Sequence, residues 1–471
     1  MRKTKIICTI GPASESEDIL KKMCLAGMNV ARLNFSHGTH EEHLVKIKNI
    51  KKVRKDLKLP VPIMLDTKGP EYRIGTFRDK TIEVKTGDSF TFTTRQLDGD
   101  KTIVSVSYQQ LPKELNTGDV IMVSNGLVCF EVKDIAGTEI HCICTEGGVL
   151  SDRKSMNFPG KKLRSDYLSE ADKKDLLFGI ENDVDFVAAS FVSDKDDVLD
   201  LRKFLDANGG QGIKIIAKIE NRSGVDNIDE ICNVADSIMV ARGDLGVEIP
   251  YEEVPVIQKY LISRCRLQGK IVITATEMLE SMIYNQRPTR AEISDVANAV
   301  YDGSSAVMLS GESASGKHPV ESVRIMSEIC EYTEQNIDYN SWFHNTEFKI
   351  LSNLDAISHS ACSMAIDVGA KALVVNSLSG LTARMVSRFR CPVDIIATTT
   401  NPKVWRQLDL SWGVIPYLSE AYSSIEVMFY EGLNSAKKTL KLKKGDNVVL
   451  TGGQIQGASG NTDTIKLESV K

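Results

Sequence analysis

Long hydrophobic runs are missing from this sequence of 471 residues. After Met1 and a short polar start, the apolar stretch Ile6–Ile10 is far shorter than a signal or membrane segment. Hydrophobic residues make up 42% and charged residues 26%, which is typical of a soluble globular protein rather than a membrane protein. We therefore expect a cytoplasmic protein with no membrane partner.

An excess of positive charge is also lacking. Lys and Arg total 58 against 63 Asp and Glu, which gives a formal net charge of −5. Non-specific binding of nucleic acid needs a broad basic surface. Nucleic acid is therefore not an expected partner.

Cysteine pairs of the Cys-x-x-Cys type are absent, although the chain has ten cysteines. The closest two, Cys142 and Cys144, fall in an alternating stretch that is typical of a strand. This spacing favours buried, reduced thiols.

The length of the chain predicts about two to four domains. Apolar runs alternate with amphipathic stretches, as expected where strands alternate with helices. Eight runs are predicted strands: Lys5–Ile10, Met28–Leu33, Pro62–Asp66, Asp185–Phe191, Ile213–Ile219, Asp236–Ala241, Lys270–Thr274 and Ala306–Leu309. The predicted helices between them include Ser16–Leu25, His40–Leu57, Glu170–Ile180, Asp196–Leu205, Glu252–Leu267 and Arg290–Tyr301. This α/β pattern favours a (β/α)8 TIM barrel over an open sheet.

Two regions differ from the barrel pattern. Between the third and fourth strands, short alternating runs such as Thr81–Val84 and Glu139–Cys144 predict a small inserted β domain. After about residue 345, strands at Ala372–Asn376, Val393–Thr398 and Asn447–Thr451 predict a separate α/β domain. The predicted boundaries are 1–69 and 166–345 for the barrel, 70–165 for the insertion and 346–471 for the C-terminal domain.

Polar residues are dense just past the barrel strands, where the active site of such a barrel forms. Lys218 and Glu220 are two residues apart, which places an ammonium beside a carboxylate; a purely structural ion pair is the alternative. Asp244 could join Glu220 in an oxygen-only site suited to Mg²⁺. These residues indicate Mg²⁺-assisted chemistry on an anionic substrate, and they leave the substrate open.

Seven segments in register resemble the signature set of the pyruvate kinase family. They are 33–38 (LNFSHG), 64–71 (MLDTKGPE), 218–221 (KIEN), 241–250 (ARGDLGVEIP), 278–282 (MLESM), 287–292 (RPTRAE) and 295–303 (DVANAVYDG). The resemblance covers residues 1–471 and implies a barrel, a β-barrel lid and a C-terminal regulatory domain. It implies transfer of the phosphoryl group of phosphoenolpyruvate to ADP, which gives pyruvate and ATP.

The resemblance also implies roles for single residues. Lys218 would stabilise the migrating phosphoryl group and the enolate, with Arg32 and Thr276 as further catalytic residues. Glu220 and Asp244 would hold Mg²⁺ or Mn²⁺. The residues expected to bind substrate are Arg32, Lys218, Gly243, Asp244 and Thr276, and those expected to contact nucleotide are Asn34, His37, Arg73 and Lys154.

A second cation is implied at the same mouth. Similar proteins hold K⁺ with oxygen atoms of residues that match Asn34, Ser36, Asp66 and Thr67. Glu71 is the residue that K⁺-dependent members carry, whereas a lysine there can replace the metal, so the resemblance predicts K⁺ dependence. His40 and His43 fall on the predicted helix 40–57 and are interpreted as a solvated helix face rather than metal ligands.

The C-terminal domain resembles the regulatory domain of the family. Its segment Ser377, Ser379, Gly380 and Thr382 precedes a predicted helix and could cradle a phosphorylated effector. Gly452-Gly453 and the turn 457–460 could close over the same effector or could be ordinary turns. The resemblance further implies a homotetramer without the additional C-terminal domain of some bacterial relatives.

Three positions depart from the family pattern, and two other functions stay open. Glu277 stands where Gln is commoner, Ser165-Asp166 replace Leu-Pro, and Ser193 replaces Arg. The extra carboxylate of Glu277 could weaken binding of an anion beside Thr276. The alternatives are a Mg²⁺-dependent C–C lyase, which needs neither the K⁺ residues nor the lid, and a catalytically silent metabolite-binding regulator.

Overall fold

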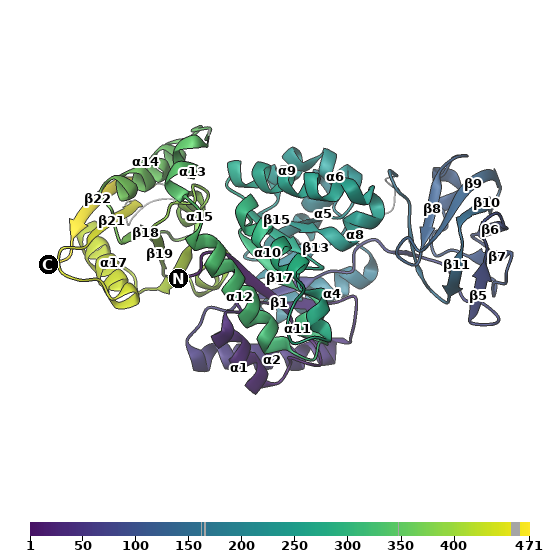
Figure 1. Ribbon diagram of the computed structural model, residues 1–471, viewed down its shortest axis with the longest axis horizontal. Helices are drawn as coiled ribbons and strands as arrows, with labels where there is room; N and C mark the ends of the chain where they lie inside the picture. The colour runs from purple at the N-terminus through teal and green to yellow at the C-terminus, as the bar shows by residue number, and fades with distance from the viewer. Residues whose placement is uncertain (162, 164–165, 347, 454–461) are drawn as a thin grey trace.

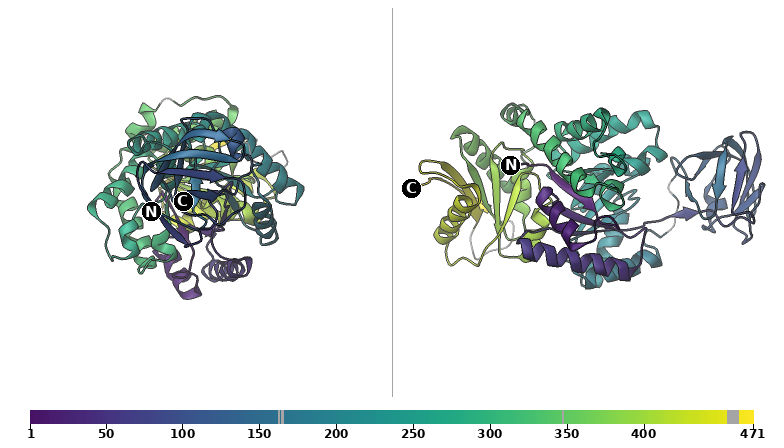
Figure 2. Two further views of the ribbon diagram at one scale, coloured as in Figure 1. Left: turned by 90° about the vertical axis from the view of Figure 1, so that its right-hand side faces the viewer. Right: turned by 60° about the horizontal axis from the view of Figure 1, so that its bottom comes forward.

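The computed structural model describes residues 1–161, 163, 166–346, 348–453 and 462–471 (Figure 1). Three parts follow one another along its longest axis: the inserted β domain, the barrel and the C-terminal domain (Figures 1 and 2). Within the described ranges, no helix combines the length and the apolar character that crossing a bilayer requires.

Eight parallel strands close into a barrel in the order β1-β17-β16-β15-β14-β13-β3-β2. They are β1 (Lys5–Thr9), β2 (Val30–Asn34), β3 (Ile63–Asp66), β13 (Phe186–Ala189), β14 (Lys214–Ile219), β15 (Ser237–Ala241), β16 (Ile271–Ala275) and β17 (Ala306–Leu309). Nearly every residue in these strands is buried, because helices cover the outside and side chains fill the inside. The predicted TIM barrel is confirmed.

Helices surround the barrel, and several of them begin at a short polar side chain that caps them. In α2, for example, Thr39 accepts a hydrogen bond from the backbone of Glu42, and the Glu42 carboxylate accepts one from the backbone of Thr39. The barrel helices are α1 (Glu17–Ala26), α2 (His40–Leu57), α4 (Glu170–Glu181), α5 (Lys195–Ala207), α6 (Arg222–Asp226), α7 (Ile228–Val234), α8 (Arg242–Glu248), α9 (Val254–Leu267), α10 (Arg290–Asp302), α11 (Gly311–Ala314) and α12 (Pro319–Gln335), with short 3₁₀ turns η1 (Tyr251–Glu253) and η2 (Glu280–Ile283).

The inserted domain is all β apart from one turn of helix, α3 (Leu111–Glu114). Its seven-stranded sheet has the order β4-β12-β8-β9-β10-β6-β7, and β11 pairs with β5 in a second sheet. The strands are β4 (Tyr72–Arg73), β5 (Thr81–Val84), β6 (Ser89–Thr93), β7 (Ile103–Ser105), β8 (Val120–Val123), β9 (Val128–Ala136), β10 (Glu139–Glu146), β11 (Gly148–Ser151) and β12 (Ser155–Asn157). A core built around Phe90, Phe92 and Phe130 belongs to this domain alone.

The C-terminal domain is a five-stranded sheet of order β20-β19-β18-β21-β22. Its strands are β18 (Ala372–Asn376), β19 (Asp394–Thr399), β20 (Val414–Leu418), β21 (Asn447–Gly453) and β22 (Thr462–Ser469), and its helices are α13 (Tyr339–Asn345), α14 (Asn353–Asp367), α15 (Leu381–Ser387), α16 (Pro402–Leu408) and α17 (Ile425–Leu440). It packs against the end of the barrel where the strands begin: Arg406 Nε lies 2.6 Å from the Asp185 carboxylate, and Lys5 Nζ lies 3.4 Å from Asp409. The domain boundaries stay predictions, and the one at 165/166 lies at the edge of the described residues.

All ten cysteines are buried and unpaired, which confirms the prediction of buried thiols. In the described part of the chain, no group of three or more His, Cys, Asp and Glu side chains has the arrangement of a metal cluster. His37, His40 and His43 are therefore not part of such a group.

Candidate active site

A cavity of about 620 Å³ lies between the mouth of the barrel and the inserted domain. Barrel residues after β2, β3, β13 and β14 form one side, and residues around β4 and β12 form the other. The predicted site residues that line the cavity are Arg32, Asn34, Ser36, His37, Glu71, Arg73, Lys154, Lys218 and Asp244, and Lys68 lines it as well. A site of this size with convergent cationic and polar side chains suits a small anionic substrate.

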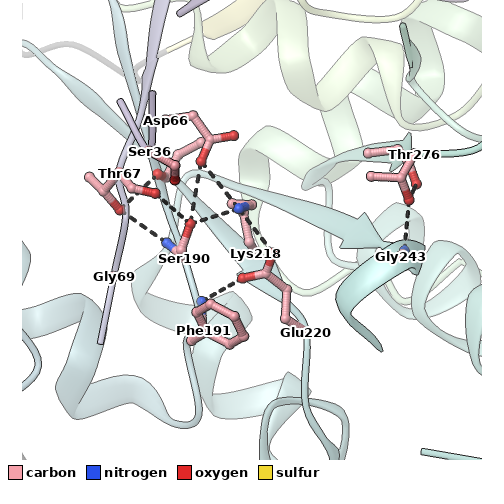
Figure 3. A network of polar contacts seen from close by, with 12 residues as sticks. Ser36, Asp66, Thr67, Gly69, Ser190, Phe191, Lys218, Glu220, Gly243 and Thr276 are labelled. Atoms are coloured by element: carbon pink, nitrogen blue, oxygen red, sulfur yellow. Dashed lines mark hydrogen bonds and ion pairs between the residues drawn. The ribbon is translucent and has the colours of Figure 1, made fainter. Parts of the chain in front are cut away.

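One side of the mouth, which we call the charged wall, consists of Arg32, Asp66, Ser190, Lys218 and Glu220. Figure 3 shows its last four members. Lys218 Nζ lies 3.1 Å from Asp66 Oδ1 and 2.9 Å from Glu220 Oε1. Arg32 Nε lies 2.6 Å from Asp66 Oδ2. The predicted pairing of the Lys218 ammonium with the Glu220 carboxylate is therefore present, and a second carboxylate joins it.

Burial and charge set the protonation states in the charged wall. Burial disfavours the charged forms of Lys218 and Asp66, but their neighbours outweigh it. The carboxylates of Asp66 and Glu220 raise the pKa of Lys218. The cations of Arg32 and Lys218 lower the pKa of Asp66. Burial, with the Asp244 carboxylate nearby, raises the pKa of Glu220 to about 8. Lys218 therefore stays cationic. The positive charge around Glu220 is too small to offset the effect of burial on its carboxylate.

Glu220 and Asp244 fit a divalent cation. Glu220 is fully buried; its Oε2 accepts a hydrogen bond of 2.6 Å from the Phe191 amide, and its Oε1 lies 2.9 Å from Lys218 Nζ. The Asp244 carboxylate raises the pKa of Glu220, so a cation held by the two would relieve this repulsion, and together they form a hard oxygen donor set. The residues present could therefore hold Mg²⁺ or Mn²⁺.

The other side of the mouth, which we call the backbone wall, consists of Gly243, Asp244 and Thr276. Thr276 Oγ1 accepts a hydrogen bond of 2.7 Å from the Gly243 amide, and Figure 3 shows this pair apart from the Lys218 cluster. Thr276 and Glu277 have φ values of 71° and 53°, and Arg242 Nη2 donates to both of their carbonyls at 2.6 and 3.2 Å. The guanidinium of Arg242 thus stabilises a left-handed backbone that non-glycine residues seldom adopt.

The four residues predicted to hold K⁺ lie at the ends of two adjacent strands. Asn34 and Asp66 are register partners between β2 and β3, and Ser36 and Thr67 follow them. Asn34 Oδ1 accepts from the Ser36 amide at 3.1 Å, and the Thr67 carbonyl accepts from Ser190 Oγ at 2.7 Å. Neutral oxygens beside one carboxylate fit a monovalent cation such as K⁺.

The residues predicted to contact nucleotide line the same cavity. Glu71 binds both Lys68, at 3.0 Å, and Arg73, so this carboxylate holds two cations at the cavity edge. Lys154 is exposed on the inserted domain.

The interpretation of His40 and His43 on α2 as a solvated helix face is wrong for His43. His43 does not lie on a solvated face: it is 2% exposed, and its ring stacks on Phe35 with centroids 4.0 Å apart. Its Nε2 lies 2.9 Å from the carbonyl oxygen of His37, so His43 supports the turn that carries His37. His40, which is half-buried, lies 2.6 Å from Asp175.

Two residues of the mouth were missed by the sequence analysis. Thr9, at the end of β1, accepts a hydrogen bond of 2.8 Å from Arg32 Nη1. Ser190, just past β13, accepts one of 2.6 Å from Lys218 Nζ. Both are polar residues at the C-terminal end of a barrel strand. Inspection of the polar residues at strand ends, which identified the site residues of the other six strands, would have found these two as well.

The residues proposed for an effector lie in the C-terminal domain, far along the chain from the cavity. Gly380 caps α15 with a φ of 74°, and Thr382 is buried with its hydroxyl 2.7 Å from that of Thr462. Ser377 and Ser379 lie on the turn between β18 and α15. Of the predicted closing segments, Gly452 and Gly453 end β21, whereas the turn 457–460, like Ser165 among the departures, lies outside the described residues.

Comparisons with known proteins agree with this architecture. Residues 1–323 match the barrel domain of pyruvate kinase, and residues 355–468 match the pyruvate kinase alpha/beta domain. Pyruvate kinase from Clostridium perfringens is 46% identical over 474 residues, which cover all of both chains, and that from Sporosarcina psychrophila is 46% identical over all of this chain and 81% of its own. The crystal structure of a pyruvate kinase from Cryptosporidium parvum superposes with a TM-score of 0.94 at 41% identity, over 100% of this chain and 96% of that chain. The chain therefore belongs to the pyruvate kinase family of enzymes.

Proposed function

We propose that the cavity catalyses transfer of the phosphoryl group from phosphoenolpyruvate to ADP. The observation that carries the proposal is the buried Lys218 ammonium, held between Asp66 and Glu220 at the edge of a cavity that Arg32 also lines. An oxygen of the terminal phosphate of ADP attacks phosphorus, and the bond from phosphorus to the enolate oxygen breaks. The enolate then takes up a proton at carbon and becomes pyruvate.

Lys218 and Arg32 act on the charge that moves in this reaction. Negative charge spreads over the phosphoryl oxygens and the enolate oxygen as the bond breaks, and fixed cations in a site of low dielectric stabilise it. Arg32 is oriented by Asp66 and Thr9, so its guanidinium is held in place before substrate arrives. Lys218 need not lose its proton, and the carboxylates beside it keep it charged.

Glu220 and Asp244 would hold Mg²⁺ in this site, since their oxygens are the donors described above. The bound ion supplies Lewis-acid polarisation of the substrate oxygens. The Gly243 and Asp244 amides and the Thr276 hydroxyl orient the substrate carboxylate from the backbone wall. Arg73 and Lys154, on the inserted domain, bind the nucleotide phosphates with Asn34 and His37 on the barrel, so the inserted domain acts as the lid.

Asn34, Ser36, Asp66 and Thr67 would hold K⁺, and Glu71 leaves this corner of the site without the lysine that could replace the ion. A phosphorylated effector binds the segment 377–382 of the C-terminal domain, and the chain assembles as a homotetramer in which effector and substrate sites are coupled. The enzyme works in the cytoplasm, and its ten unpaired thiols suit that reducing compartment.

The test is an assay coupled to lactate dehydrogenase, with phosphoenolpyruvate, ADP and Mg²⁺, in the presence and absence of K⁺. We expect K⁺-stimulated turnover that falls by about 10³-fold in Lys218→Met. The matched control is Lys214→Met, which removes another lysine from β14. Lys214 lies at the start of this strand, away from the mouth, and pairs with Asp236 at 2.9 Å. Its turnover should stay within about twofold of the wild type.

Two results of this assay would contradict the proposal. No turnover in any salt, even with candidate sugar-phosphate effectors, would favour a metabolite-binding regulator without catalytic activity. Equal losses in Lys218→Met and Lys214→Met would mean that the effect comes from the stability of β14 rather than from the ammonium.

A further inference from the structure

Ser190 is the least expected member of the charged wall. It follows β13 directly, is 2% exposed and lies between the ends of β3 and β14, which flank β13 in the barrel. None of the roles proposed above uses its hydroxyl, yet this hydroxyl is in contact with both the Lys218 ammonium and the Thr67 carbonyl.

The hydroxyl makes the shortest of the contacts that orient Lys218. Three oxygens surround Lys218 Nζ: Ser190 Oγ at 2.6 Å, Glu220 Oε1 at 2.9 Å and Asp66 Oδ1 at 3.1 Å. An ammonium has three N–H groups, so each oxygen can take one of them. The serine hydroxyl is the neutral member of the three, and its short, directional hydrogen bond fixes where one N–H points.

The single proton of the hydroxyl is already committed elsewhere. Because an ammonium can only donate, Ser190 Oγ must accept from Lys218, and its own proton goes to an oxygen. The Thr67 carbonyl, at 2.7 Å, is a better acceptor for it than Asp66 Oδ1, at 3.3 Å. A chain of two hydrogen bonds thus runs from Lys218 through Ser190 to Thr67.

The backbone of Ser190 is fixed on both sides. Its amide donates to Thr67 Oγ1 at 3.2 Å, and its carbonyl accepts from Tyr167 Oη at 2.8 Å. Gly69, with a φ of 73°, packs so closely that a Cβ there would come within 2.9 Å of Ser190 Cβ. The serine therefore has little room to change its rotamer or to follow Lys218 if that side chain moves.

We propose that Ser190 is a positioning residue, which aims the Lys218 ammonium and links it to Thr67 in the predicted K⁺ site. The inference rests on the proposed function, because it assigns Ser190 to the alignment of the cation that stabilises the transferring group. Ser190 does not touch the reacting atoms in this scheme. Loss of its hydroxyl should affect the aim of Lys218 more than the affinity for substrate.

The experiment compares Ser190→Ala with Ser304→Ala. Ser304 is also a buried barrel serine, 1% exposed, with a hydrogen bond of 2.8 Å to Thr274 Oγ1, but it precedes β17 at the opposite end of the barrel. In the full chain, we expect kcat of Ser190→Ala to fall about tenfold or more, as for loss of a hydrogen bond to a charged group, with KM for phosphoenolpyruvate within about twofold. Ser304→Ala should keep kcat within about twofold.

Two readouts do not depend on turnover. Crystal structures of the wild type and of Ser190→Ala should show Lys218 Nζ displaced from Asp66 in the variant. K⁺ should raise the Tm of the wild type, and the K⁺ concentration that gives half of this rise should be about threefold higher in Ser190→Ala. If Ser190→Ala does not fold, Ser190→Cys, which keeps the shape but accepts hydrogen bonds weakly, should show the same changes.

Each contrary result overturns the proposal. An unchanged kcat in Ser190→Ala does so, as does an equal fall in Ser304→Ala. If the wild type itself shows no turnover with phosphoenolpyruvate and ADP, the proposed function fails, and the crystal structures then decide: a displaced Lys218 Nζ supports the positioning role, and an unmoved one excludes it.

Discussion

In the charged wall, Asp66, Lys218 and Glu220 are at most 8% exposed, whereas in the backbone wall Asp244 is exposed and Thr276 is half-buried. The charged wall is held by contacts between its own ionised side chains. The backbone wall is shaped by the main chain around Thr276, which Arg242 holds from behind.

The difference indicates how each wall should respond to substitution. A buried group that loses its charged partner has no water to replace it, so changes in the charged wall should have large effects. Apart from Asp244, which would hold Mg²⁺ together with Glu220, the backbone wall offers neutral hydrogen bonds near solvent, so single changes at these neutral groups should have moderate effects on binding.

Among these substitutions, Glu220→Gln should cause the largest loss of turnover. It keeps the shape of the side chain but removes the charge that would hold Mg²⁺, so turnover should fall by about 10³-fold and binding of Mn²⁺ should weaken by about tenfold or more. Titration of Mn²⁺ by electron paramagnetic resonance measures the second effect. Glu248→Gln is the control, because Glu248 also lines the cavity but bonds Asn157 of the inserted domain at 2.8 Å. Unchanged Mn²⁺ affinity in Glu220→Gln would contradict the metal assignment.

Replacement of K⁺ by tetramethylammonium tests the other cation of the mouth. Turnover at saturating phosphoenolpyruvate should fall about tenfold or more, since one positive charge is lost beside Asp66. Glu71→Lys should restore part of the activity without K⁺, because family members with a lysine at this position use its ammonium in place of the ion. Equal turnover of the wild type with and without K⁺ would contradict the K⁺ site, but not the difference between the two walls.

Thr276→Ala probes the backbone wall. The hydroxyl that accepts from the Gly243 amide is lost, so KM for phosphoenolpyruvate should rise about tenfold, with a smaller change in kcat. Thr276→Ser keeps the hydroxyl and should restore KM. A loss in Thr276→Ala as large as that in Glu220→Gln would mean that the two walls do not differ in the way proposed.

Glu277→Gln should give the smallest effect. The Glu277 side chain is exposed, so its charge is screened by water and salt, and its removal should lower KM for the anionic substrate only about twofold. The effect should grow as ionic strength falls. A KM that responds to salt in the same way in variant and wild type would show that this carboxylate does not reach the substrate.

Much of the fold could be predicted from the sequence, because buried parallel strands are continuous apolar runs of adequate length. All eight barrel strands were found in this way. Two of the shortest strands were not found: β4 has two residues and β12 has three, too few to show alternation. In the C-terminal domain, the edge strands β20 and β22 were missed, since their mixed exposure gives no continuous apolar run.

The candidate site was predicted less evenly than the fold. The pairing of Lys218 with Glu220 follows from a spacing of two residues along a strand, which geometry fixes. The contact of Lys218 with Ser190 joins two different strands, so its partner depends on the register between β13 and β14. The burial of His43 depends on the ring of Phe35, a contact that helical periodicity alone does not reveal.

The insertion between β3 and β13 bears on the order in which the chain folds. These neighbouring strands are joined at the backbone of Ile63, whose amide donates to the Asp185 carboxylate 122 positions later. Closing so long a loop has an entropic cost that rises with its length, by about 0.6 kcal/mol for each doubling. The insertion brings its own ends together, since β4 pairs with β12, and it has a separate core. If the insertion folds early, it shortens the effective loop and makes closure of the barrel faster than the separation in sequence would suggest.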